Sequence, residues 1–126
     1  GRLGLVELAA LVAYGRLLVS TDTGVAHLAT AYRTPSVVLF GPVSPRRWGP
    51  PPDRPWHRVL GPGEGLVDTP AGSSDTLAAG PGEDRPRLHP ALAAIGVDEV
   101  LAAVVEAERA GRYRAVSAGR NRAAAA

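Results

Sequence analysis

Two short apolar runs, each preceded by a segment with helical periodicity, constrain the fold of this chain more than any other feature. Apolar residues recur at helical spacing over Gly4–Tyr14, and a buried-strand pattern follows at Leu17–Val19. A second helical segment, Gly24–Tyr32, precedes a second apolar run, Ser36–Phe40. Helices and strands that alternate with connections of two to four residues are typical of a parallel sheet with helices on its faces. The sequence therefore predicts the α/β class.

The predicted elements begin and end at residues that favour such boundaries. Gly15 stands where a left-handed cap would close the first helix. Asp22 and Thr23 precede the second helix, and both are good N-capping residues. Pro35 ends that helix, since the residue before a proline disfavours helical backbone.

The second half of the chain is less regular. Residues 56–60 predict a short edge strand, and residues 61–88 predict a long surface loop rich in Pro and Gly. Residues 111–126 combine Arg with small side chains and offer little to bury, which indicates a disordered basic tail. The interpretation is one partial domain over residues 1–110, followed by the tail.

A final helix is predicted to pack on the sheet near the C-terminal end. Asp98 and Glu99 in its first turn complement the helix dipole, and Gly111 follows its end. Its expected packing face is one apolar stripe, formed by Val97, Val100, Leu101, Val104 and Val105.

Composition excludes several classes of protein. The absence of Cys rules out disulfides and thiolate metal sites. No apolar segment is long enough to span a bilayer, and Glu7 interrupts the only stretch that resembles a signal peptide. All fourteen basic residues are Arg, which we attribute to a GC-rich genome rather than to a binding partner. A soluble, cytoplasmic chain is expected, with peripheral contact at the inner face of the membrane as an alternative.

The residues most informative about function are 20–27, Ser-Thr-Asp-Thr-Gly-Val-Ala-His, at the carboxyl end of the first predicted strand. Ligands of open α/β sheets bind at that edge, and the unpaired N–H groups of a helix start form a seat for phosphate. Gly24 permits close approach of a ligand, Thr23 can add a hydroxyl donor, and His27 can reach back from one turn further on. Asp22 has two interpretations, an N-cap or a carboxylate that orients sugar hydroxyls. His27 could instead be an ordinary core histidine.

Other candidate residues have weaker support. Arg46 or Arg47 could lie near a diphosphate, although exposed loop arginines are more often only solvated. Trp48 is interpreted as a packing residue, and His57 and His89 as surface residues without ligand spacing.

This motif lies within a longer ordered pattern. Residues 18–31, 34–45 and 48–50, together with the helix at residues 8–11, resemble the C-terminal donor-site region of glycosyltransferase family 9, which is heptosyltransferase-like. A weaker resemblance returns at residues 95–105, which is similar to the family's final helix.

The resemblance implies part of a two-domain GT-B glycosyltransferase that transfers a sugar from a nucleotide donor, typically ADP-heptose, with inversion. The residues that match its donor-contacting motif are Asp22, Thr23, Gly24 and His27. The resemblance suggests metal-independent chemistry, and the absence of an Asp-x-Asp pair agrees with it. No bound metal or other cofactor is expected. The family's acceptor-binding half, its presumed catalytic carboxylate and the first units of its donor domain have no counterpart here. We therefore expect a C-terminal portion, present as a fragment, a truncated gene or a remnant, that does not turn over alone.

Two other functional classes stay open at this point. One is a non-catalytic module that binds nucleotide sugars. The other is a basic interaction protein whose arginine-bearing tail contacts nucleic acid or an anionic membrane. Binding that survives loss of Asp22 and His27 would distinguish the latter.

Overall fold

The computed structural model describes residues 3–41, 43–61 and 88–124, and the side chains of 114–124 lie outside this description. The predicted loop therefore lies almost wholly outside the described residues. The helices and strands of the described part are α1 (Leu5–Tyr14), β1 (Leu18–Thr21), α2 (Gly24–Tyr32), β2 (Ser36–Leu39), α3 (Pro45–Trp48), β3 (His57–Leu60), α4 (Pro90–Ala93) and α5 (Val97–Ala124).

The three described strands form one parallel sheet in the order β1-β2-β3. Leu18 pairs with Ser36, and Ser36 pairs in turn with His57, so the strands begin level with one another. Their carboxyl ends consequently share one edge of the sheet. The predicted α/β class is confirmed, and the strand predicted at residues 56–60 is present as β3.

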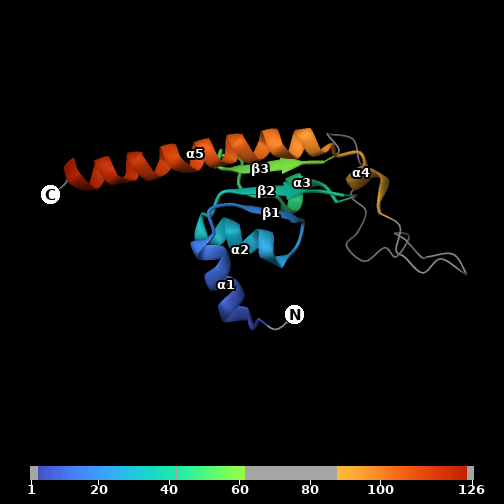
Figure 1. The fold of residues 1–126 in the computed structure, drawn as a ribbon, viewed down its shortest axis with the longest axis horizontal. Helices are drawn as coiled ribbons and strands as arrows, with labels where there is room; N and C mark the ends of the chain where they lie inside the picture. Colours follow the sequence, from blue (N-terminus) through green and yellow to red (C-terminus); the bar gives the residue numbers. More distant parts are fainter. Residues whose placement is uncertain (1–2, 42, 62–87, 125–126) are drawn as a thin grey trace, which may run out of the picture.

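Helices cover both faces of this sheet (Figure 1). On one face α2 contacts β1 and β2, and α1 packs against α2; on the other face α5 contacts β2 and β3. Successive side chains along β2 point to alternate faces of the sheet, so this strand contributes to the hydrophobic cluster on each face. Val38 and the following Phe40 pack with Ala26 of α2, whereas Val37 packs with α5. The central strand is thus buried on both faces, as its apolar run predicted.

Only part of the apolar stripe predicted for α5 faces the sheet. Val97, Leu101 and Val105 are 74%, 57% and 55% exposed, while Ala103 and Ala107 are buried against the sheet. Small side chains let the helix backbone approach the strands closely, and Val104 completes this contact. The prediction that all five stripe residues form the packing face is therefore wrong for Val97, Leu101 and Val105.

The same helix continues to Ala124, through most of the segment that composition predicted to be a disordered tail. Figure 1 shows it running past the end of the sheet. Within the described residues, no helix combines the length and the apolar character needed to cross a membrane.

Several element boundaries differ from prediction. Gly15 closes α1 with φ −62°, an ordinary extended conformation, so the predicted left-handed cap is absent there. A left-handed residue instead closes α2: Arg33 has φ 61°, and its N–H bonds to carbonyls of the last turn of that helix. Thr23 alone is the N-cap of α2, and Asp22 lies one residue outside it.

Two histidines interpreted as surface residues have structural contacts. His57 is 7% exposed, and its Nδ1 lies 2.9 Å from the Oγ of the fully buried Ser36. The surface interpretation is wrong for His57, because the first residues of β2 and β3 stand side by side and turn inward. His89 is partly buried, and its Nδ1 accepts a hydrogen bond from the N–H of Ala91 at 3.2 Å, which caps α4.

Candidate functional site

The chain turns from β1 into α2 at the carboxyl edge of the sheet. Thr21 ends β1 level with Leu39 of β2, and the Asp22 N–H donates to the Leu39 carbonyl at 3.2 Å. Thr23 follows, and Gly24 begins the helix. The structure therefore places residues 20–27 at the edge where α/β sheets bind ligands, as the sequence predicted.

Within the described part of the chain, no side chain caps the start of α2. Thr23 has the extended backbone of an N-cap, with φ −147° and ψ 170°, yet its side chain makes no bond to the helix. The Ala26 N–H bonds to the Thr23 carbonyl at 3.0 Å. Among the described residues, nothing pairs with the N–H groups of Gly24 and Val25. These groups form the positive end of the helix dipole and are available to an anion.

The Thr23 hydroxyl is engaged elsewhere. Its Oγ1 lies 3.2 Å from the Ser20 Oγ, and Ser20 in turn donates to the Thr21 carbonyl at 2.9 Å. Ser20 did not stand out in the sequence as a site residue. Its spacing of three residues from Thr23, across the end of a strand, was the available signal, but only the folded turn shows that the two hydroxyls meet.

Asp22 and His27 both stand without polar side-chain contacts inside the described structure. Asp22 is half-buried and His27 is exposed, and neither side chain makes a hydrogen bond or ion pair with another described residue. The interpretation of Asp22 as the N-cap is wrong, because the helix starts one residue too late for it. The interpretation of His27 as a core histidine is also wrong, since its side chain is not buried. Both groups can therefore interact with a molecule from outside.

Gly24 is not required by the protein's own packing. A Cβ at this position would meet no atom within 4 Å, and its φ does not lie in the left-handed region. Open space over the first helical residue is what close approach of a ligand to the backbone requires.

The short helix α3 follows the carboxyl end of β2. Ser44 caps it, accepting the Arg46 N–H at 3.3 Å, and both Arg46 and Arg47 are exposed. The Arg47 guanidinium lies 5.8 Å from the centre of the Trp48 ring, which is 45% exposed. Trp48 therefore supports an arginine at the surface more than it fills a core, and ligand contact by the arginines stays a prediction.

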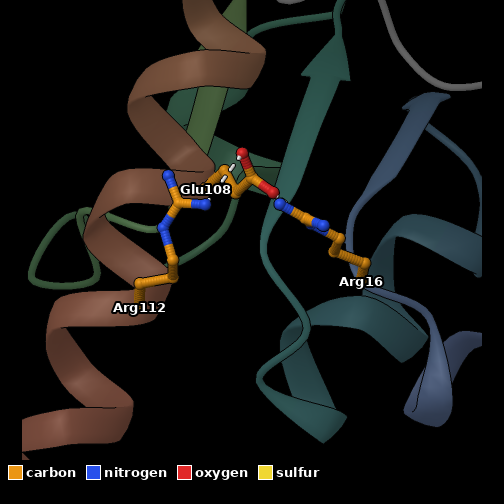
Figure 2. A network of polar contacts seen from close by, with 3 residues as sticks. All are labelled: Arg16, Glu108 and Arg112. Carbon is orange, nitrogen blue, oxygen red and sulfur yellow. Dashed lines mark hydrogen bonds and ion pairs between the residues drawn. The ribbon is translucent and has the colours of Figure 1, made fainter.

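A second polar cluster lies at the opposite edge of the sheet (Figure 2). The Glu108 carboxylate stands between Arg16, which precedes β1, and Arg112, one turn further along α5. The hydrogen bond from Arg16 is the main cause that lowers the pKa of Glu108, and the charge of Arg112 adds to it. The Arg16 side chain is 77% exposed. Because it joins the loop before β1 to α5, this cluster holds the two layers together and is separate from the candidate site.

Potential metal ligands do not gather in the described part of the chain. Over residues 3–41, 43–61 and 88–124, no group of three or more His, Asp or Glu side chains could hold an ion. Metal-independent binding remains a prediction.

The fold and the arrangement of the candidate site define the structural class of this protein. The chain is a parallel α/β protein whose ligand edge presents an uncapped helix start, flanked by a carboxylate and an imidazole. Residues 1–60 match the family model described as glycosyltransferase family 9 (heptosyltransferase). The resemblance predicted from the motif is thus confirmed for the segment that contains the three described strands and residues 20–27. The weaker resemblance at residues 95–105 lies outside the match. Comparisons with curated proteins and with solved structures found no match.

Proposed function

We propose that this chain provides the donor-binding part of a glycosyltransferase and binds a nucleotide-activated sugar through residues 22–27. The donor is ADP-linked, with ADP-heptose or a similar sugar, and the acceptor is a glycan or glycolipid of the cell envelope. One observation carries the proposal. The uncapped start of α2, with Asp22 and His27 beside it, lies at the carboxyl edge of the sheet inside the family-matched segment.

The chemistry of sugar transfer explains why these groups suit that role. As the anomeric bond lengthens, negative charge grows on the departing diphosphate, and fixed donors placed there stabilise the transition state preferentially. The N–H groups of Gly24 and Val25 are such donors, because the helix holds them in place before the ligand arrives. His27 lies one turn later and adds a side-chain donor. The Asp22 carboxylate accepts hydrogen bonds from hydroxyls of the sugar or ribose.

The remaining parts of the reaction belong to a larger protein in this proposal. The acceptor site and the catalytic base come from an additional domain, which the family resemblance implies. The transfer needs no metal, since helix N–H groups and His27 supply the stabilisation of the leaving group. The site faces the cytoplasm, where nucleotide sugars are made, and the acceptor is reached at the inner face of the membrane.

Calorimetric titration tests the donor site. The purified chain and His27→Ala are titrated with ADP, an ADP-sugar and a UDP-sugar at moderate salt, with circular dichroism to establish folding. We expect saturable binding that prefers the ADP compounds and weakens by about 1–3 kcal/mol in His27→Ala, the cost of losing one donor to a charged group. Tyr32→Ala is the matched control, because Tyr32 is exposed at the other end of the same helix.

Each outcome has a distinct meaning. Absence of binding by the folded chain would reject the donor-site proposal. Equal weakening in His27→Ala and Tyr32→Ala would reject the role of His27, because the loss would then reflect the helix as a whole. Binding that is confined to DNA or anionic vesicles and unchanged in His27→Ala would favour a basic interaction protein.

A further inference from the structure

The hydroxyl groups of Ser20 and Thr23 take part in two successive hydrogen bonds, and the donor of each bond can be identified. Ser20 Oγ donates its only hydrogen to the Thr21 carbonyl at 2.9 Å. The contact of 3.2 Å between Ser20 Oγ and Thr23 Oγ1 then requires Thr23 to be the donor. The Thr23 hydrogen is therefore directed toward the strand.

This arrangement departs from what threonine does at an N-cap. A Thr side chain in that position normally accepts a hydrogen bond from the second or third N–H of the helix. Here those groups belong to Val25 and Ala26, and Thr23 bonds to neither through its side chain. The chain backbone has the extended conformation that capping needs, so the backbone does not prevent it. The hydroxyl of Ser20 is the partner that draws Thr23 away.

We propose that Ser20 is a positioning residue that keeps the start of α2 uncapped and its N–H groups available to the ligand. The inference rests on the proposed function, since it assigns a role within the same donor site. Ser20 itself does not touch the ligand. It holds Thr23 in a rotamer that leaves the Val25 N–H open, at the expense of a capping bond that would stabilise the helix.

Removing the Ser20 hydroxyl should therefore raise the stability of the chain and lower its affinity for ADP. In Ser20→Ala, Thr23 loses its partner and rotates to cap the helix. We expect the amide of Val25 to exchange with solvent more slowly, and the melting temperature to rise. Affinity for ADP should fall about 2- to 30-fold, because the ligand must displace a bond of capping strength. A residue that merely supported the fold would lower both stability and affinity.

Variants of Thr23 separate this mechanism from a local disturbance. Thr23→Val cannot cap the helix, so adding Ser20→Ala to Thr23→Val should change neither amide exchange nor ADP affinity. Ser20→Thr retains the hydroxyl and should bind ADP like the parent chain. The experiment measures amide hydrogen exchange by NMR and ADP binding by calorimetry for the parent chain and these four variants.

The two measurements distinguish failure of this inference from failure of the proposed function. Unchanged exchange at Val25 in Ser20→Ala would overturn the positioning role, whatever the chain binds. The role would also be overturned if Ser20→Ala cost the same ADP affinity in the parent chain as in the Thr23→Val variant. If the parent chain does not bind ADP, slower exchange in Ser20→Ala would support the control of the cap by Ser20 and reject the donor site.

Discussion

At the scale of one residue, a substitution at Gly24 best distinguishes an effect on folding from an effect on binding. Its Cβ position is open, so Gly24→Ala should fold normally and gain up to about 0.5–1 kcal/mol from the better helix propensity of Ala. The added methyl group would stand where the ligand approaches the backbone. We expect ADP binding to weaken by about 1–3 kcal/mol, the usual cost of forcing an extra methyl group into a packed contact.

Paired thermal unfolding and calorimetry measure both effects in Gly24→Ala. Gly96→Ala serves as the control, because a Cβ there also meets nothing within 4 Å and the residue precedes α5, outside residues 20–27. Undiminished ADP affinity in Gly24→Ala would show that the ligand does not approach this part of the backbone.

The sequence was sufficient to locate the candidate residues but not to describe their interactions. Asp22, Thr23, Gly24 and His27 follow from a motif at the junction of two predicted elements, and the structure places that junction at the expected edge of the sheet. Which residue caps the helix depends on a shift of one position at the end of β1. The role of Ser20 depends on a side-chain rotamer. Neither can be obtained from spacing alone.

At the scale of elements, α5 shows how packing overrides an apolar pattern. Ala107 is fully buried against the sheet, whereas Leu101 is 57% exposed. We expect Ala107→Leu to lower the free energy of unfolding by about 1–3 kcal/mol through overpacking. Leu101→Ala should change it by no more than about 0.5 kcal/mol, as is usual at exposed positions. Urea denaturation of both variants measures the difference, and a larger loss in Leu101→Ala would contradict this packing.

The stripe was mispredicted because periodicity identifies apolar residues without saying which side of a broad apolar surface meets the sheet. Ala is only weakly apolar, so Ala103 and Ala107 added little to the pattern although they are the α5 residues buried against the sheet. His57 shows the converse effect. A polar residue in a predicted edge strand is expected to be exposed. His57 is buried instead, and its Nδ1 is hydrogen-bonded to Ser36 in the interior.

At the scale of the whole molecule, the order of elements was the most predictable property. Helix, strand, helix and strand with short connections leave few alternatives to a parallel sheet, and the three strands adopt that arrangement. Contacts between distant parts of the chain were not predictable. The Arg16–Glu108 pair joins residues 92 positions apart, and nothing near either residue in sequence indicates the other.

That pair makes stability of the whole fold depend on pH in a defined direction. Arg16 lowers the pKa of Glu108 in the folded state below its ordinary value of 4.5. The stabilisation is therefore present above the ordinary value and is lost as the pH falls through the lowered pKa. Glu108→Gln should melt at a lower temperature than the parent chain at pH 7, and the two melting temperatures should converge as the pH falls through the lowered pKa of Glu108, where the parent carboxyl becomes protonated. In both proteins Arg16 and Arg112 then face an uncharged side chain.

Thermal melts of both proteins across this pH range measure the convergence, with Asp53→Asn as the control. Asp53 is exposed and has no ion pair among the described residues, so its replacement should leave the pH dependence of the parent chain unchanged. Added salt should reduce the effect of Glu108→Gln at pH 7, because the Arg16 side chain is largely exposed and its charge is screened. A difference in melting temperature that persists undiminished into acid would mean that Glu108 stabilises the α5 contact by packing rather than by its charge.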